Sequence, residues 1–89
     1  MVIYKYIIEP DDYIKINVPK FSKILSVQLQ KSNVCVWILC DPNQPLTTRT
    51  FRLAGTGHEI KEDIAGLIFI GTFQVYGGDL VFHLFEVTE

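Results

Sequence analysis

The hydrophobic pattern of this chain repeats with a period of two, in short stretches from one end to the other. Such alternation places apolar side chains on one face of a β-strand. It predicts seven strands, over residues 2–8, 13–18, 24–30, 34–40, 48–54, 67–75 and 80–87. No segment has the length and apolar period of a packed helix, although a short helical turn is expected at residues 59–64. The chain is therefore expected to be all-β.

The segments between these stretches contain residues that end strands. Residues 31–33 are short enough to join two strands in a hairpin, and the Y-G-G-D segment at 76–79 tolerates the positive φ of another. Pro42 and Pro45 lack the amide hydrogen that a ladder needs. Residues 57–66 form the one long connection. This spacing of strands and turns favours a small antiparallel β-sandwich or barrel of about seven strands.

The size of the chain permits one core. With 89 residues and 10.2 kDa, a folded monomer exposes about 5,300 Å² of the ~14,800 Å² that its unfolded chain would expose. One domain over residues 1–89 is therefore expected. Two strands, 34–40 and 80–87, are apolar on both faces. Burial in the centre of a fold explains such strands, and so does closure by another subunit, which favours a homo-oligomer.

Charge and targeting signals narrow the classes of function. Eight Lys and Arg against ten Asp and Glu give a net charge of −2, which disfavours general nucleic-acid binding. The sequence has no apolar run of membrane-spanning length and begins unlike a signal peptide, so a cytoplasmic protein without a membrane partner is expected. Cys35 and Cys40 should point to opposite strand faces as buried free thiols. No cysteine or histidine has metal-ligand spacing, so neither a metal nor a cofactor is expected.

The segment A-G-T-G-H-E at residues 54–59 is the most distinctive motif. Two glycines around a threonine can direct three backbone amides into one concavity, where a hydroxyl and the imidazole of His58 would suit an anionic group such as a phosphate. The motif lacks the longer glycine spacing and the Lys of a nucleotide-hydrolase loop. The alternative is a strand that ends through a glycine bulge, with Thr56 capping its own turn.

Polar side chains at alternating strand positions form a second candidate site. They are Gln28, Gln30, Arg52, Gln74 and the pair Thr50 and Thr72. If their strands shared a sheet, these groups would make one polar patch, with Trp37 or Tyr76 nearby to stack on a planar ligand. The alternative is a solvated sheet face, which antiparallel sheets normally have.

Five stretches of the chain resemble a known family. They are I-L-S-V-Q-L-Q at 24–30, V-W-I-L-C-D-P at 36–42, F-R-L-A-G-T-G-H at 51–58, I-G-T at 70–72 and V-F-H-L-F-E at 81–86. Together they are similar to small uncharacterised proteins found mostly in bacteriophage and prophage genomes. The resemblance implies a phage origin and nominates Gln28, Gln30, Trp37, Gly55, Thr56, Gly57, His58, Gly71, Thr72 and His83.

These observations favour a non-enzymatic accessory protein of a phage. We expect a homo-oligomer that binds a small anionic, nucleotide-type ligand and so counters a host defence. The expected ligand contacts are Gly55, Thr56, Gly57, His58, Gln28, Gln30, Arg52 and Trp37. The alternative is a protein-interaction module, either an inhibitor of a host protein or a minor virion component. A third reading, cleavage of a nucleotide with His58 as general acid or base, lacks a visible second catalytic group.

Overall fold

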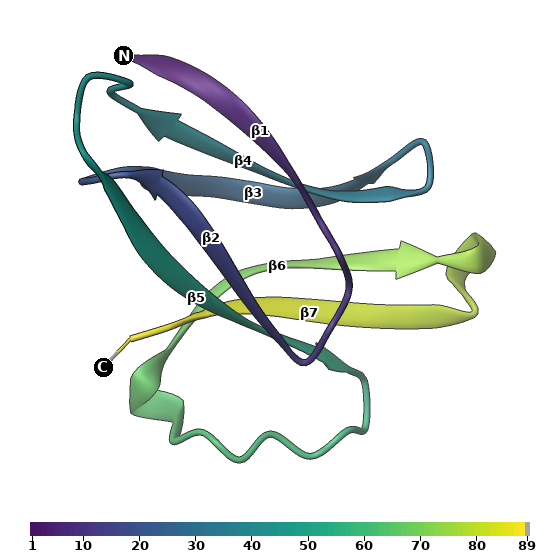
Figure 1. The fold of residues 1–89 in the computed structure, drawn as a ribbon. Helices are drawn as coiled ribbons and strands as arrows, with labels where there is room; N and C mark the ends of the chain where they lie inside the picture. The colour runs from purple at the N-terminus through teal and green to yellow at the C-terminus, as the bar shows by residue number, and fades with distance from the viewer. Residues whose placement is uncertain (89) are drawn as a thin grey trace.

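The computed structural model describes residues 1–88 and contains seven strands in that range (Figure 1). The strands are β1 (Val2–Ile8), β2 (Tyr13–Pro19), β3 (Lys23–Gln30), β4 (Asn33–Cys40), β5 (Leu46–Gly55), β6 (Leu67–Val75) and β7 (Leu80–Val87). Two short 3-10 turns, η1 (Ile64–Gly66) and η2 (Tyr76–Gly78), precede and follow β6. The prediction of an all-β fold is confirmed. The helical turn predicted at residues 59–64 is wrong in position, because the Asp63 carboxylate caps a turn that starts at Ile64.

The strands form two antiparallel sheets, with the orders β1-β4-β3 and β2-β5-β7-β6. The sheets make a sandwich that is not closed, so the sandwich of the two predicted architectures is the correct one. The two-residue loop of Lys31 and Ser32 joins β3 to β4, and both residues have the positive φ of a tight hairpin turn. The β6–β7 hairpin turns through Tyr76, Gly77 and Gly78, which also have positive φ.

The core lies between the sheets and takes residues from every strand. Its buried members are Ile8, Ile14, Val18, Val27, Val34, Val36, Ile38, Cys40, Phe51, Leu53, Phe73 and Leu84. In β4 the even-numbered residues point inward, because side chains alternate along a strand. Cys40 therefore faces the core while Cys35 faces outward, and both are buried free thiols, as predicted.

The two sheets approach each other most closely along β3 and β6, which are edge strands of different sheets. Gly71 of β6 packs against Val27 of β3, where a Cβ on residue 71 would come within 2.9 Å of the Val27 Cγ1. Both strands carry a bulge near this contact, between Ile24 and Ser26 in β3 and between Phe69 and Gly71 in β6. The seam between these two edges positions the candidate site described below.

The sandwich is open and thin. Its accessible surface is 5947 Å², above the about 5,300 Å² expected for a monomer of this mass. The radius of gyration is 13.1 Å, against about 12.1 Å for a compact domain of this length. Many large apolar side chains are consequently exposed, among them Ile3, Ile7, Phe21, Leu46, Ile64, Phe69 and Tyr76.

Candidate ligand-binding site

His83 lies at the centre of the candidate site, on the outer face of the four-stranded sheet. In the register of β5, β7 and β6 it stands between Ala54 and Thr72. Its Nδ1 lies 2.9 Å from the Thr72 Oγ1, and its Nε2 lies 2.8 Å from the Thr56 Oγ1. Both ring nitrogens are therefore within hydrogen-bond distance of a hydroxyl, which fixes the orientation of the imidazole.

A shallow groove of about 370 Å³ continues from Thr72 across the seam between the two sheets. Gln74 of β6 and Gln28 of β3 line it. Gln28 belongs to the other sheet, yet it reaches this groove because β3 lies alongside β6. We call the row formed by Thr56, His83, Thr72, Gln74 and Gln28 the polar stripe.

Two backbone amides of the glycine loop, residues 54–59, donate hydrogen bonds within the protein. The Thr56 amide donates to the Val81 carbonyl and the His58 amide donates to the Gly55 carbonyl. These two amides are therefore used inside the protein, and binding of an anion at this loop stays a prediction. The β5–β7 ladder ends here, and Gly57 supplies the positive φ of 88° that turns the chain away from the sheet.

The imidazole of His58 folds back over Gly55. A Cβ on residue 55 would lie 2.9 Å from two atoms of that ring, so a larger residue there would displace the ring. His58, Thr56 and Asp79 line a second hollow of about 220 Å³ beside the start of β7. Thr56 thus belongs both to this hollow and to the polar stripe.

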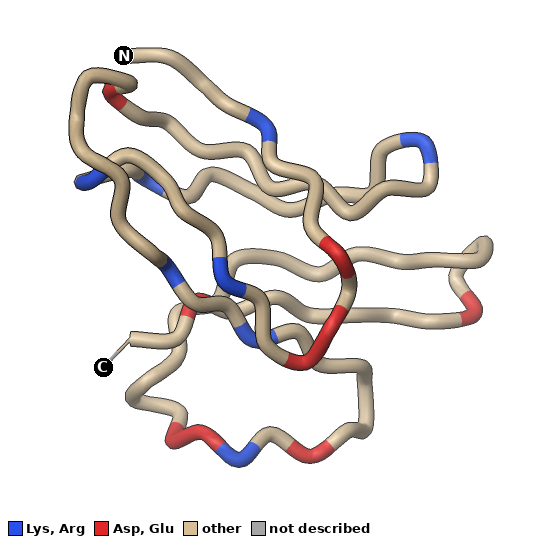
Figure 2. Tube along the Cα trace, in the orientation of Figure 1, with Lys and Arg blue, Asp and Glu red and all other residues tan. Residues whose placement is uncertain are grey.

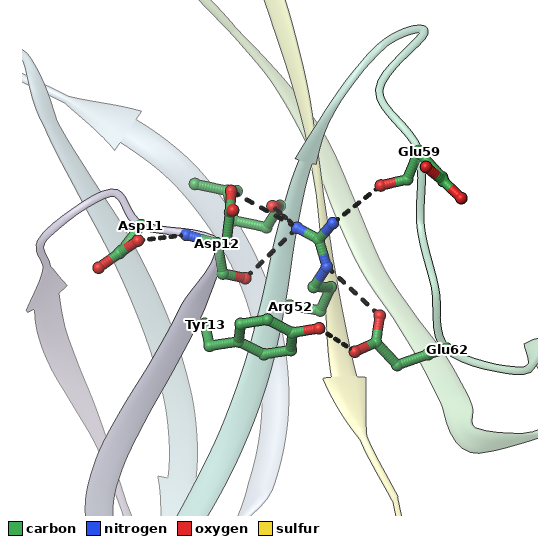
Figure 3. A network of polar contacts seen from close by, with 7 residues as sticks. Asp11, Asp12, Tyr13, Arg52, Glu59 and Glu62 are labelled. Atoms are coloured by element: carbon green, nitrogen blue, oxygen red, sulfur yellow. Dashed lines mark hydrogen bonds and ion pairs between the residues drawn. The ribbon is translucent and has the colours of Figure 1, made fainter.

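Arg52 is held by a network of internal contacts rather than presented to a ligand (Figure 3). Its side chain is on the outer face of β5 and the residue is 6% exposed. Its Nη2 donates to the Glu59 carbonyl at 3.0 Å, and its Nη1 donates to the carbonyls of Leu53 and Asp12. Its Nε lies 3.3 Å from the Glu62 carboxylate. Arg52 therefore ties two loops, residues 9–12 and 57–63, to β5.

Tyr13 completes this network. Its ring lies beneath the guanidinium, with 5.2 Å between the Arg52 Cζ and the ring centroid, and its hydroxyl donates to Glu62. That hydrogen bond lowers the pKa of Glu62 and raises the pKa of Tyr13, and the charge of Arg52 lowers the Glu62 pKa further. The Glu62 carboxylate balances the Arg52 charge, so this cation is neutralised inside the protein.

Trp37 and Gln30 lie on the outer face of the three-stranded sheet. Trp37 is half-buried in β4, opposite Ser26 and therefore diagonal to Gln28 across the β3–β4 ladder. The Gln30 Oε1 accepts a hydrogen bond from the Lys5 Nζ at 2.7 Å. Trp37 therefore lies on β4, the strand next to β3, which lines the groove. The side chain of Gln30 is hydrogen-bonded to Lys5 instead.

The structure brings some of the site residues predicted from the sequence together and places others elsewhere. The structure gathers Gln28, Thr56, Thr72 and Gln74, and it places Gly55, Gly57 and His58 in the adjoining turn. The resemblance nominated His83, but reasoning from residue types left it without a role. The signal for that role lies in the strand register, which pairs His83 with Thr72, and in the turn after β5, which brings Thr56 to the other ring nitrogen.

The described residues, 1–88, contain neither a cluster typical of a metal site nor a membrane-spanning helix. No group of three or more His, Cys, Asp or Glu side chains among them is arranged to hold a metal ion. Within the same residues, no helix is both long enough and apolar enough to cross a membrane.

Comparison with curated proteins returned no match, and comparison with solved structures also returned none. A family model, described as a domain of unknown function (DUF7352), matches residues 1–89. The match covers the whole chain. A match to an uncharacterised family agrees with the resemblance of the five sequence stretches. The chain belongs to the DUF7352 family of domains of unknown function.

Proposed function

We propose that this protein is a non-enzymatic binding protein that holds a small, hydrogen-bonding ligand on the polar stripe. One observation carries the proposal: His83 is fixed between the hydroxyls of Thr56 and Thr72, at the end of an exposed groove lined by Gln28 and Gln74. Hydroxyls, amides and an imidazole donate and accept hydrogen bonds, as recognition of a nucleobase or a ribose requires.

The chemistry of the stripe selects the recognised part of a nucleotide-type ligand. Its side chains are neutral amides and hydroxyls together with one imidazole, and Asp79 lines the adjoining hollow. Arg52 is paired with Glu62 and does not supply a cation. The nucleoside portion, rather than the phosphate, is therefore the part that we expect the stripe to recognise, with Trp37 available for stacking beyond Gln28.

Thermal-shift titration with cyclic nucleotides, ADP-ribose-type nucleotides and nucleosides tests this proposal. A ligand present at 100 times its Kd stabilises the protein by about 2.7 kcal/mol. Thr72→Val should remove most of that shift, because it deletes a hydroxyl of the stripe with little change in shape. Thr50→Val is the matched control, since Thr50 lies on the same sheet opposite Lys15. Absence of a shift with every compound, or an equal shift in Thr72→Val, contradicts the proposal.

Mass spectrometry of the incubated ligand separates binding from catalysis. Recovery of intact ligand is expected from a binding protein. Conversion to product would contradict the non-enzymatic assignment and would direct attention to His58, which shares a hollow with Asp79. A His58→Gln variant, compared with the wild-type protein, would then show whether that imidazole takes part.

The second candidate function is a protein-interaction module that also self-associates. It is supported by the exposed apolar side chains of the open sandwich and by β1, an edge strand that pairs with β4 on one side only and on which Ile3 and Ile7 are exposed. A pull-down with wild-type protein, Ile7→Lys and Thr72→Val tests it. A partner retained by Thr72→Val and lost by Ile7→Lys supports a protein surface, whereas a partner retained by both variants contradicts the use of β1.

The biological setting is proposed from the resemblance of the five sequence stretches to small phage and prophage proteins. In that setting the protein acts in the host cytoplasm, and it sequesters a nucleotide signal of a host defence. As an interaction module it would instead inhibit a host protein or join the virion. Phage plating on cells that carry a nucleotide-signalling defence should improve when the protein is expressed, and Thr72→Val should abolish the improvement. Equal plating with and without the protein contradicts the defence role.

A further inference from the structure

Phe21 occupies the turn between β2 and β3 in an unusual state. The residue is 78% exposed and its φ is +67°. The left-handed backbone region disfavours a bulky side chain, and glycine or asparagine would make the same turn without strain. The Lys20 Nζ lies 5.7 Å from the centroid of the ring. The turn therefore presents an aromatic ring to solvent at a cost in conformational free energy.

An apolar pocket of about 270 Å³ opens between the β3–β4 and β6–β7 hairpins. Leu29, Phe73, Leu80 and Phe82 line it, with Pro10 at its edge. The sandwich is not covered at this end. Apolar side chains that would be buried in a closed sandwich therefore line an accessible hollow. An apolar cavity of about 150 Å³ holds a benzene molecule, and a phenylalanine ring therefore fits in this pocket.

The exposed ring and the pocket lie at opposite ends of one strand. Phe21 precedes β3, whereas Ser32, which lines the pocket, follows it. Figure 1 shows the β2–β3 turn and the two hairpins at the two ends of the sandwich. The eight residues of β3 span about 26 Å. Phe21 cannot reach the pocket of its own chain, but a second copy can bring one to it.

The charges at the two ends are complementary. Lys20 and Lys23 flank Phe21, while Glu9 and Asp11 flank Pro10 at the edge of the pocket. Asp79 precedes Leu80 at the same end, where Lys31 is the opposing charge. Figure 2 shows basic residues at the β2–β3 turn, with one acidic residue between β4 and β5 at the same end, and acidic residues between β1 and β2 and at the β6–β7 hairpin. Opposite charges at the rim favour approach of the basic end to the acidic end.

We propose that copies of this chain associate head to tail, with Phe21 of one copy seated in the apolar pocket of the next. The inference rests on the self-association included in the second candidate function and names the surfaces that carry it. Such a contact joins two different surfaces, so repetition produces either a ring or an open filament.

Sedimentation velocity over a range of concentrations tests the contact, using two variants and one control. Phe21→Gly removes the ring and relieves the positive φ, so the melting temperature should be unchanged or higher. Leu80→Trp fills the mouth of the pocket with a larger side chain. Ile64→Ser is the control, because Ile64 is equally apolar and 86% exposed but lies in η1. We expect either variant to weaken association about 30-fold or more, as loss of a central aromatic contact does, and the control to leave it unchanged.

An equimolar mixture of the two variants provides the sharpest test. Phe21→Gly keeps an open pocket and Leu80→Trp keeps the ring, so the mixture should form heterodimers although each variant alone is monomeric. A mixture that stays monomeric overturns the head-to-tail contact, as does wild-type association that Phe21→Gly leaves unchanged. A wild-type protein that is monomeric at every concentration overturns the proposed self-association as well.

Discussion

Gly71 of β6 lies against Val27 of β3 so closely that a side-chain carbon on residue 71 would meet the Val27 Cγ1 at 2.9 Å. This contact joins the edges of two sheets that share no backbone ladder in the described part of the chain. It also brings Gln28, the neighbour of Val27, to the groove that Thr72, the neighbour of Gly71, lines. The small size of Gly71 therefore permits the close approach of the two sheets at this point, beside the groove that Gln28 and Thr72 line.

Gly71→Ala should destabilise the protein by about 1–3 kcal/mol, the usual range for overpacking a core contact. The added methyl group would force the stiff Val27 side chain out of its preferred rotamer or push the two strands apart. Urea denaturation of wild type and variant measures the change. Val27→Ala combined with Gly71→Ala should recover part of the loss, since it removes the clashing Cγ1. If the changes in the free energy of unfolding of the two substitutions were strictly additive, the two side chains would not be in steric conflict.

Glu86→Ala should destabilise the protein by about 2–3 kcal/mol, somewhat less than removal of one partner from a fully buried pair. The Glu86 Oε1 accepts from the Arg49 Nη2 at 2.8 Å, and the Arg49 Nη1 donates to the Ser22 carbonyl at 2.6 Å. The side chains of Arg49 and Glu86 are 23% and 12% exposed, so some solvent screens the charge that remains. Thermal unfolding provides the measurement.

A second substitution checks the cause of that loss. Arg49→Met in the Glu86→Ala background removes the uncompensated guanidinium, and it should restore part of the stability. The same pair raises the pKa of Arg49, chiefly through its hydrogen bond to Glu86. Equal stability of the single and double variants would mean that an unpaired charge was not responsible.

The pH dependence of stability should contain a contribution from Glu62 and Tyr13. The Glu62 pKa is lowered from 4.5 in the folded protein, so its contribution is present above pH ~4.5 and is lost as the pH falls through the folded value. The Tyr13 pKa is raised from 10.0. Its protonated form is favoured by folding, and that contribution is lost as the pH rises above ~10.

Tyr13→Phe tests both contributions at once, because it removes the hydroxyl that connects them. Urea denaturation from pH 3 to 11 should show a shallower loss of stability in acid and the disappearance of the alkaline contribution. Tyr4→Phe, at an exposed tyrosine of β1, is the control. Superimposable profiles for wild type and Tyr13→Phe would contradict the assignment.

Arg52→Lys should loosen the loop of residues 57–63 without unfolding the sheets. Lysine keeps the charge but lacks the planar fork that reaches the Glu59 carbonyl and the Asp12 carbonyl together. We expect a loss of about 1–3 kcal/mol and faster amide exchange in this loop by mass spectrometry. Exchange in the β3–β4 hairpin serves as the internal control, and unchanged exchange in the loop would contradict the anchoring role.

The fold could be predicted from the sequence because alternation identifies each strand locally. Three strands have the predicted bounds, and the others are longer by one to three residues. The predicted strands end at residue 18 and begin at residue 48, so they leave out Pro19 and Leu46. They pair at the end of β2, an edge strand, where a missing amide hydrogen costs little.

The candidate site was only partly predictable because it depends on contacts between distant strands. Gln28 and Arg52 both alternate with apolar neighbours, and the sequence offers no way to tell them apart. A loop folds over Arg52, whereas Gln28 stays open to the groove. The position of His83 between two threonines requires the register of three strands, which alternation alone does not determine.

The strand order also has a consequence for folding. β1 pairs with β4, from Val2 opposite Cys40 onward, and β2 pairs with β5. At about 5–20 residues per second, a ribosome needs roughly 2–6 s to reach the end of β4 after it has completed β1. The β3–β4 and β6–β7 hairpins close locally, but β1 and β2 must wait for partners made later. The apolar strand β1 is thus exposed to other chains until β4 follows it, and chaperone binding there is the expected protection.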